Sequence, residues 1–399
     1  MLQLSIINFT PNSYILVEEK ELNDRFFIIQ SGKVRCHKNN DTNGSSVKYL
    51  AIGPLYEPSA SIGVIPCMSG HSQIENAIAV TDVRVISVMK DQYPELIRKN
   101  TPIALKIIRT FANRMRTMNE ELTKLTLSKV SSDSPEQIFN VAKFYDSKME
   151  YSIATFAYYQ YLKECPSGED AQIAKQRFLK YKPSSKAIYF EPTAELFRSY
   201  PEGTMIFSES QKGSDMFVIQ DGKVEISKVV NGAEVVLAVL GKGDMFGEMA
   251  LLENKPRSAS AIARSDCKLM VINRQNFDQM VGTQPQLISR LTTTLAERLW
   301  SMYRQLDNAC LSDPMHKIID MLALQIEKNH KYTGSFQTEL TVQDVINMCA
   351  IPENQQPFVK YQLQSEPSLK FAEGKILVPD CNELIKQAAF YRKKCGKGA

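Results

Sequence analysis

The sequence has few of the residues that build metal centres and disulfide frameworks. Its 399 residues include 4 histidines, and its 8 cysteines are scattered without a Cys-x-x-Cys pair. Structural zinc sites and small disulfide-linked domains both need such residues at short, regular spacing. The sequence therefore predicts no disulfide framework and no metal site, and the reducing cytoplasm fits it best.

Long apolar runs are also absent. No stretch approaches the roughly 18–20 apolar residues that a membrane-spanning helix needs. The segment 1–5 has neither a basic start nor a sustained apolar stretch. We therefore expect no signal peptide, no membrane association and a cytoplasmic location.

An excess of one charge is the third thing the sequence lacks. Lys and Arg number 48 against 44 Asp and Glu, and this balance argues against a protein that coats nucleic acid. A local basic surface is still compatible with this balance of charges. Apolar residues make up 43% of the chain, enough for packed cores throughout a protein of roughly two to four domains.

The sequence contains an internal repeat. The segment 27–34, Phe-Ile-Ile-Gln-Ser-Gly-Lys-Val, reappears at 217–224 as Phe-Val-Ile-Gln-Asp-Gly-Lys-Val, an offset of 190 residues. Further along, Ile-Ala at 78–79 corresponds to Ile-Ala at 262–263, an offset of 184 residues. Because short loop insertions or deletions explain the difference, we infer two copies of one domain.

Each copy has the pattern of a compact β domain followed by a long helix. Short β-branched and aromatic runs alternate with Gly, Asn and Asp turns, which is typical of a β sandwich or barrel. Apolar residues then recur every three or four positions, as in a helix that pairs with another helix. These residues are Ile108, Phe111, Met115, Met118, Leu122 and Leu125 in the first copy, and Ile288, Leu295, Leu299, Met302 and Leu306 in the second. A helix packed on its own β domain is an equal alternative.

The second copy carries the segment with the most chemistry. Gly247 closes a loop, and Glu248 opens a short helix that Pro256 must end. The first backbone N–H groups of such a helix lack internal partners and suit a phosphate. Arg257 offers the same anion a planar guanidinium, whereas the Glu248 carboxylate is suited to accept from a sugar hydroxyl. These residues predict a site for a nucleotide.

The motif Gly-Glu-Met-Ala-Leu at 247–251, with Arg-Ser-Ala at 257–259, resembles the phosphate-binding cassette of cyclic nucleotide-binding domains. The resemblance covers about 186–310. It implies that Glu248 binds the ribose 2′-hydroxyl and Arg257 the cyclic phosphate. The other residues expected in this site are Gly247, Met249, Ala250, Leu251, Ser258 and Ala259. The implied ligand is a cyclic mononucleotide, cyclic AMP by default, and we expect no cofactor.

The first copy departs from this motif. It keeps the glycine as Gly63, but Val64 stands where the glutamate would be and Gln73 where the arginine would be. Without the acid and the guanidinium, the site has neither a ribose acceptor nor a charged group for phosphate. We therefore expect the first copy to bind no cyclic nucleotide.

The base-facing positions of the second copy differ from those expected for adenine. In bacterial transcription factors of this family, the long helix after the β-roll faces the base, and an ungapped match puts Met302 and Tyr303 there. Small hydroxyl residues would be expected for adenine, so a cyclic dinucleotide is an alternative ligand. Arg298, Trp300 or Tyr303 would otherwise stack on the base or serve as core residues.

Residues 132–182, between the copies, have the pattern of a helical insert. Small and aromatic residues fall at tetratricopeptide-like spacing, namely Ala142, Tyr145, Tyr151, Ala154, Tyr158 and Pro166. One such unit is too small to stand alone. It should therefore pack on a neighbour or meet a protein partner.

The last segment, 312–390, has the order of a winged helix-turn-helix. Helices are expected near 314–328, 341–349 and 354–364, with a hairpin over 369–378. This layout resembles the DNA-binding domain of the Crp/Fnr transcription regulators, which also follows a cyclic nucleotide domain.

The third of these helices would read DNA bases. Its candidate contact residues are Asn354, Gln355, Gln356 and Lys360. Because Lys360 is its one basic residue, the cations that position phosphates are sparse. A basic tail, Arg392, Lys393, Lys394 and Lys397, is expected to be disordered.

The sequence thus predicts an α+β multidomain protein. Two β-roll, jelly-roll-like domains of the cyclic nucleotide-binding type, each with its long helix, are expected at 1–128 and 186–310. A tetratricopeptide-like helical insert is expected at 132–182 and a degenerate winged-helix-like domain at 312–390.

The expected function is that of a cyclic-nucleotide sensor of the Crp/Fnr type. The ligand would bind in the second β-roll and act, through the helix at 285–308, on a C-terminal domain that regulates transcription. The alternatives are a signalling scaffold that binds protein partners instead of DNA, and a sensor of another nucleotide. No nucleophile–base set or Walker-type loop occurs, so we expect no enzyme and no catalytic residue. We expect either a homodimer or an intramolecular pseudo-dimer of the two long helices.

Overall fold

The computed structural model describes most of the chain. The described residues are 4–20, 24–38, 55–56, 60–127, 134–189, 196–230, 232–253, 255–349, 351–352, 354–372 and 374–395. The chain divides into two compact units. Unit 1 comprises Met1–Tyr93, Met118–Ser128 and Ala296–Ala399, and unit 2 comprises Pro94–Thr117 and Lys129–Leu295.

The β-roll of the first copy lies in unit 1. Its two antiparallel sheets have the strand orders β1-β8-β3-β6 and β2-β7-β4-β5. The strands are β1 Ser5–Phe9, β2 Tyr14–Leu16, β3 Arg25–Ser31, β4 Val34–His37, β5 Leu55–Tyr56, β6 Ser61–Ile62, β7 Asn76–Ala79 and β8 Val83–Met89. The helices of the first copy are α1 Val64–Ser69, α2 Tyr93–Lys99 and α3 Thr101–Leu127, of which residues 94–117 belong to unit 2. Alternate residues of the strands face inward and form one apolar core, which includes Phe27, Ile29 and Val85.

The β-roll of the second copy lies in unit 2 and has the same plan. Its sheets have the orders β14-β11-β16-β9 and β10-β15-β12-β13. The strands are β9 Phe197–Tyr200, β10 Met205–Phe207, β11 Met216–Asp221, β12 Val224–Val230, β13 Ala233–Leu240, β14 Met245–Phe246, β15 Ser260–Ala263 and β16 Cys267–Ile272. The helices of the second copy are α7 Glu248–Glu253, α8 Arg274–Thr283 and α9 Pro285–Ala309, of which residues 296–309 belong to unit 1.

Strand register confirms that the two copies share one fold. The β3–β8 ladder pairs Phe27 with Ser87, and the β11–β16 ladder pairs Phe217 with Val271. These pairs follow the offsets of 190 and 184 that the sequence gives for the two strands. Both ladders shift register before the fourth residue after the phenylalanine.

A glycine in each copy explains part of the repeated motif. Gly32 and Gly222 follow β3 and β11 with φ angles of +90° and +92°. A Cβ would lie 2.2 Å from the backbone oxygen of Asp82 in the first copy, and 2.4 Å from that of Asp266 in the second. Only glycine fits this left-handed turn against a neighbouring backbone.

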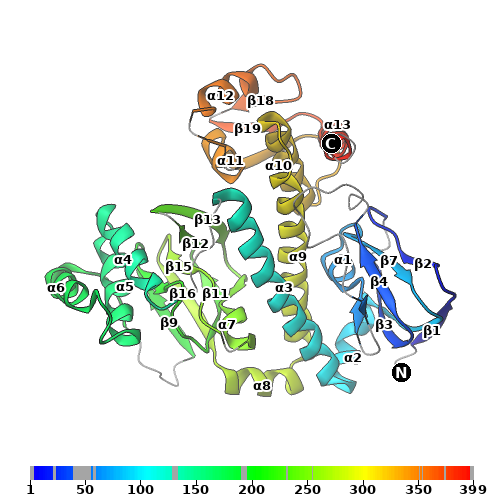
Figure 1. Cartoon of the computed structure of the whole chain (residues 1–399), viewed down its shortest axis with the longest axis horizontal. Helices are drawn as coiled ribbons and strands as arrows, with labels where there is room; N and C mark the ends of the chain where they lie inside the picture. The colour runs from blue at the N-terminus through cyan, green and yellow to red at the C-terminus, as the bar shows by residue number, and fades with distance from the viewer. Residues whose placement is uncertain are drawn as a thin grey trace. The chain divides into compact units, whose positions relative to one another are not determined.

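The insert packs on the second β-roll, in agreement with the expectation from its size (Figure 1). Its helices are α4 Gln137–Ser147, α5 Tyr151–Glu164 and α6 Ala171–Tyr181. Their apolar core includes Met205, Val229 and Ile262 from β10, β12 and β15. The Tyr145 hydroxyl bonds Ser227 of β12 and Glu234 of β13. A protein partner for the insert stays a prediction.

The C-terminal segment lies in unit 1 and has the predicted order of helices and hairpin (Figure 1). The helices are α10 Pro314–Lys328, α11 Val342–Met348, α12 Gln356–Gln364 and α13 Cys381–Cys395, and the strands are β17 Phe336–Thr341, β18 Lys370–Ala372 and β19 Lys375–Val378. Helix α10 begins after Asp313, whose carboxylate accepts from the backbone N–H of Met315 at 2.7 Å. Strand β17 and helix α13 were not predicted.

The expectation of a disordered basic tail is wrong for 392–394, because these residues belong to α13. Cys381, Leu384 and Ala388 of α13 lie on one side of the helix and are fully buried. This apolar side packs against α10 and orders the segment, and Arg392 pairs with the buried Asp320. Lys397 lies outside the described residues.

The long helices α3 and α9 bury most of the apolar positions predicted for a paired helix. Leu122 of α3 is half-buried, and the side chain of Leu125 lies outside the described residues. Ile108, Phe111, Met115 and Met118 of α3 are at most 6% exposed. On α9, all five predicted positions are buried: Ile288, Leu295, Leu299, Met302 and Leu306. Neither of these helices, nor any other among the described residues, combines the length and hydropathy required to cross a membrane.

Candidate nucleotide-binding site

A sharp turn begins the predicted site in the second copy. Strand β14 pairs with β11, with Phe246 opposite Phe217, and leads directly into Gly247. Gly247 has φ +79°, and a Cβ there would lie 2.8 Å from Nη1 of Arg257. Both conditions require glycine. Helix α7 then ends before Pro256, as predicted.

The Arg257 side chain lies inside this site and is 5% exposed. Its Nη1 donates a hydrogen bond of 2.7 Å to the carbonyl oxygen of Gly247, and its guanidinium carbon lies 4.2 Å from the ring centroid of Phe207. Its Nε has no hydrogen-bond partner within the described part of the chain. A buried guanidinium with an unused donor is suited to bind an anion.

Burial and neighbouring charges act in opposite directions on this arginine. Burial lowers the pKa of Arg257 to about 10, while the nearby carboxylates of Asp215 and Glu248 raise it. The side chain is therefore cationic at neutral pH. Because the Glu248 carboxylate lies near the Arg257 guanidinium, the two principal residues predicted from the sequence belong to one site.

The other predicted residues lie around these two. Glu248, the first residue of α7, is 2% exposed. Met249, Ala250, Leu251 and Ala259 are buried. Ser258 is half-buried, and its Oγ lies 3.6 Å from Sδ of Met249. The structure thus brings the eight predicted residues into one loop–helix–loop segment.

Two residues that position Arg257 were missed by the sequence reasoning. A Cβ at Gly213 would lie 2.6 Å from Nε of Arg257, so this glycine leaves room for the guanidinium. Phe207 supplies the aromatic face against which the cation packs. In the sequence, these two residues are a glycine in the loop before β11 and an aromatic residue in β10. Neither residue type by itself indicates a contact with an arginine.

The first copy keeps the backbone frame of this site. Ser210, with φ +63°, donates its backbone N–H to the carbonyl of Arg257 at 2.8 Å. Glu19, with φ +64°, donates in the same way to Gln73 at 2.9 Å. Gly63 has φ +73° and precedes the short helix α1. The two sites therefore correspond in backbone structure as well as in sequence.

The chemistry of the first copy is different. Val64 and Gln73 are 4% and 2% exposed, and neither carries a charge. The Leu16 side chain lies 3.0 Å from the position of a Cβ at Gly63, so that an apolar group fills the space beside the glycine. That this copy binds no cyclic nucleotide stays a prediction.

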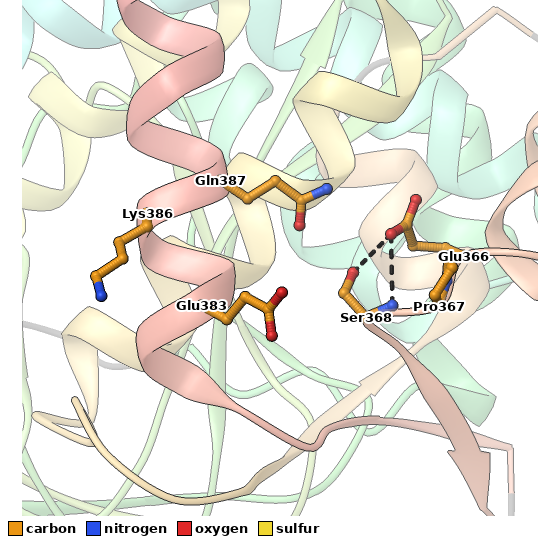
Figure 2. Close-up of a pocket in the computed structure, with 6 residues that line it drawn as sticks. All are labelled: Glu366, Pro367, Ser368, Glu383, Lys386 and Gln387. Carbon is orange, nitrogen blue, oxygen red and sulfur yellow. Dashed lines mark hydrogen bonds between the residues drawn. The ribbon is translucent and has the colours of Figure 1, made fainter.

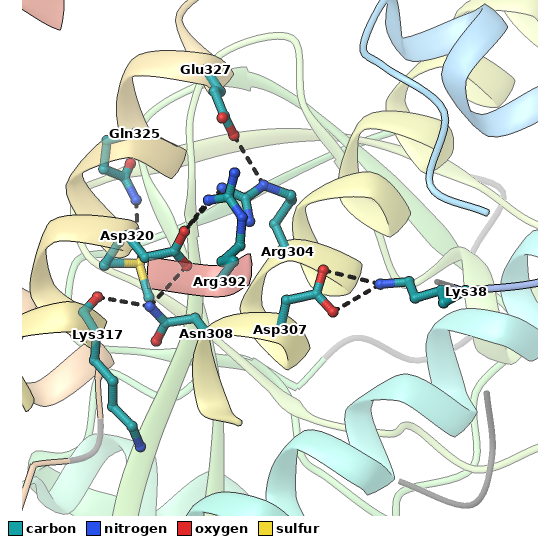
Figure 3. Close-up of polar contacts among 10 residues, drawn as sticks. Lys38, Arg304, Asp307, Asn308, Lys317, Asp320, Gln325, Glu327 and Arg392 are labelled. Atoms are coloured by element: carbon teal, nitrogen blue, oxygen red, sulfur yellow. Dashed lines mark hydrogen bonds and ion pairs between the residues drawn. The ribbon is translucent and has the colours of Figure 1, made fainter. Parts of the chain in front are cut away.

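Residues of α9 contact the first β-roll in unit 1. The ring of Trp300 stacks on His71, with ring centroids 3.7 Å apart. Nζ of Lys38 donates to both carboxylate oxygens of Asp307, at 2.8 and 3.0 Å (Figure 3). The same Nζ lies 5.5 Å from the ring centroid of Tyr303. Trp300 is therefore a core residue, one of the two roles that the sequence left open for it.

The predicted base-facing residues belong to the same stretch. Met302 and Tyr303 are each 8% exposed and lie in unit 1, whereas the site at 247–259 lies in unit 2. Arg298 lies in α9 and also belongs to unit 1. Contact of these residues with a base stays a prediction.

Two of the predicted DNA-contacting residues, Asn354 and Gln355, lie just before α12, and the other two, Gln356 and Lys360, lie in it. Asn354, Gln355 and Lys360 are exposed. Gln356 instead accepts from Gln343 of α11 at 3.2 Å and donates to the carbonyl of Ile351 at 3.0 Å. Its amide is thus used within the fold. The roles of the four residues in DNA contact stay predictions, and Glu353 lies outside the described residues.

A pocket in the C-terminal segment holds none of the predicted site residues (Figure 2). It is lined by Glu366, Pro367, Ser368, Glu383, Lys386 and Gln387. Oε1 of Glu366 already accepts from the hydroxyl of Ser368 at 2.8 Å. Nothing in its lining matches the phosphate and ribose chemistry of the second copy.

Comparison with known proteins identifies the repeated domain. Residues 6–100 and 197–284 match the family model of the cyclic nucleotide-binding domain. Over 122 residues, the chain is 33% identical to the Cyclic AMP receptor protein of Thermus thermophilus, a match that covers 30% of this chain and 56% of that protein. Over 168 residues, it is 28% identical to the cAMP-activated global transcriptional regulator CRP of Pasteurella multocida, which covers 40% of this chain and 80% of that protein.

A further relative belongs to another class of protein. Over 98 residues, the chain is 36% identical to the cAMP-dependent protein kinase regulatory subunit of Mycosarcoma maydis, which covers 23% of this chain and 19% of that protein. The chain thus spans little more than half of the Thermus relative and less than a fifth of the kinase subunit.

The stack on His71 generates a prediction about pH. Burial, with the nearby His330, Arg304 and Lys90, lowers the pKa of His71 from 6.5 to about 4. The unfolded chain therefore binds a proton here below pH 6.5 that the folded chain excludes. This contribution to stability is complete above pH 6.5 and is lost as the pH falls toward 4.

In urea unfolding, lowering the pH from 7 to 5 should reduce the free energy of unfolding of the wild type by up to about 2 kcal/mol more than that of His71→Phe. Phenylalanine keeps a ring beside Trp300 and cannot be protonated. Equal losses in the two proteins would contradict a buried neutral histidine.

The repeat, its shared strand register and the two matches of the family model lead to one conclusion: the chain carries two domains of the cyclic nucleotide-binding family, one in each copy, and has relatives among the Crp-type regulators.

Proposed function

We propose that the protein is a sensor that binds one cyclic nucleotide in its second copy and is not itself an enzyme. The observation that carries this proposal is the buried, cationic guanidinium of Arg257 beside the Glu248 carboxylate. The first would bind the cyclic phosphate and the second the ribose 2′-hydroxyl. Cyclic AMP is the ligand proposed first, because the names of the Thermus and Pasteurella relatives contain it.

Ligand binding would replace the present contacts of Arg257. A phosphate oxygen is a better acceptor for the guanidinium than the Gly247 carbonyl, because charge-assisted hydrogen bonds are roughly twice as strong as neutral ones. The phosphate would also offer an acceptor to the unused Nε. Binding would therefore favour one position of the segment 247–259 and shift the population toward it.

Two arginines connect the second β-roll near the site to the helices that follow it. One contacts the segment 247–259 and the other contacts Gly243, shortly before that segment. Arg274, the first residue of α8, donates from Nη2 to the carbonyl of Leu251 in α7 at 2.6 Å. Arg290 of α9 donates from Nη2 to the carbonyl of Gly243 at 3.4 Å. A movement of α7 would therefore act on α8 directly, and a movement of the turn at Gly243, before β14, would act on α9.

The second half of α9 is tied to the C-terminal segment by buried charges (Figure 3). Arg304 donates to Glu327 at 3.0 Å and to Asp320 at 3.2 Å, both on α10. Asn308 donates to the second oxygen of Asp320 at 3.1 Å. Breaking such a network leaves a buried charge without its partner, which costs several kcal/mol. We therefore propose that α9 and α10 move as one piece.

The output of the C-terminal segment has two candidate forms. Transcription regulation by a winged-helix-like domain is supported by the order of α10, α11, α12 and the β18–β19 hairpin, and by the name of the Pasteurella relative. Binding to a protein partner is favoured by α12 itself. Its Phe358 and Tyr361 are 64% and 70% exposed, beside the single exposed cation Lys360.

The two copies are proposed to form a pseudo-dimer within one chain. Unit 1 joins the first β-roll with residues 296–309 of α9, and unit 2 joins the second β-roll with residues 101–117 of α3. Each roll thus shares a compact unit with part of the other copy's long helix. In a dimer of two separate chains, each β-roll would pack in the same way against the long helix of the other chain. The arrangement therefore supports a monomer whose two copies take the place of two subunits.

The ligand site is tested by thermal shift with cyclic AMP, cyclic GMP and cyclic dinucleotides. One of these should raise the melting temperature of the wild type. Arg257→Ala should weaken binding at least about 100-fold, because it removes a charge-assisted fork worth about 1.5–3 kcal/mol for each hydrogen bond. The matched control, Arg84→Ala, removes an exposed arginine of the first β-roll and should respond as the wild type does. An unchanged shift in Arg257→Ala would place the site elsewhere.

The pseudo-dimer is tested by static light scattering at micromolar concentration. The expected mass is that of one 45.1 kDa chain, with and without ligand. A stable species of twice this mass would instead favour a homodimer.

A further inference from the structure

A contact outside the predicted pocket links α3 to the segment that holds Arg257. Arg116, on α3, is 6% exposed, and its Nη2 donates a hydrogen bond of 3.1 Å to the carbonyl oxygen of Pro256. Helix α3 follows the first β-roll in the chain, whereas Pro256 belongs to the second copy. The contact therefore joins the two copies within unit 2.

The carbonyl that Arg116 binds belongs to the peptide unit of Arg257. The C=O of Pro256 and the N–H of Arg257 lie in one planar peptide group. That N–H donates to the carbonyl of Gln211 at 2.9 Å. The peptide that carries Arg257 is thus held on one side by its own β-roll and on the other by the helix of the first copy.

An equivalent contact occurs in the other copy. The offset of 184 residues that relates the two sites also relates Arg116 to Trp300 and the buried Met115 to Leu299. Trp300 stacks on His71, two residues before Gln73, which takes the place of Arg257 in the first copy. Both long helices thus place the same position against the end of the other copy's site. A chance contact would not be expected to recur at the same offset.

We propose that Arg116 is a positioning residue of the nucleotide site. By holding the Pro256 carbonyl, it fixes the peptide from which the Arg257 side chain extends, and it links that peptide to α3. Ligand binding would then order α3 as well as the pocket, so that the first copy senses a ligand that it does not itself bind. This inference rests on the proposed binding of a cyclic nucleotide in the second copy.

The test uses the full chain and cyclic AMP, or the nucleotide of the panel that binds. Calorimetry measures the affinity, and amide hydrogen exchange of residues 101–117 is compared without ligand and at saturation. The variants are Arg116→Met, which keeps the length and removes the donors, and Arg116→Lys, which keeps the charge. Arg109→Met is the control, because Arg109 is an exposed arginine of the same helix.

In the wild type, ligand should slow exchange in 101–117. Arg116→Met should bind about 10-fold more weakly and, when saturated, should lose most of this slowing. Arg116→Lys should lie between the two, and Arg109→Met should match the wild type. If Arg116→Met does not fold, the comparison of Arg116→Lys with the wild type carries the same test.

Wild-type affinity or full slowing of exchange in the Arg116 variants would overturn the positioning role and leave the nucleotide site intact. A wild type that binds no nucleotide of the panel would instead overturn the proposed function, and this inference with it.

Discussion

The burial of one cation, Arg257, constrains the structure around it. A guanidinium removed from water needs acceptors and packing that replace its hydration. Here the Gly247 carbonyl accepts one bond, and the Phe207 ring covers one face. Residue 247 must be glycine, because its φ is +79° and a Cβ there would lie 2.8 Å from the guanidinium, and glycine at 213 leaves room for the same group. These features leave Nε without a partner among the described residues, and so leave the site suited to an anion.

The duplication shows which parts of this arrangement belong to the fold and which to the ligand. Both copies keep the left-handed glycine, the positive φ before the site and the same ladder registers. Only the second keeps the acid and the arginine. In the first, Val64 and Gln73 stand where the acid and the arginine would be, and Lys38 is paired with Asp307 of α9. The first copy has therefore kept the backbone conformation of the site but not the charged residues that would bind a nucleotide.

Sequence reasoning located the parts that lie close together in the chain. Gly247, Glu248 and Arg257 fall within eleven positions, and each has a chemical role that its residue type indicates. The double copy, the two long helices and the α10–α12 order were also predicted, because periodicity and turn residues encode them locally.

The parts that were missed depend on contacts between distant segments. Gly213 and Phe207 act through a side chain more than 40 positions away, and Arg116 acts through a peptide 140 positions away. No local pattern reports such a contact. Helix α13 was missed for a different reason, since the cations near its end obscured the buried positions of Leu384 and Ala388.

The central claim, one nucleotide site in two copies of one domain, is tested most directly by the stoichiometry of a calorimetric titration. One cyclic nucleotide should bind per 45.1 kDa chain. Two sites per chain, or none with any cyclic nucleotide, would contradict it.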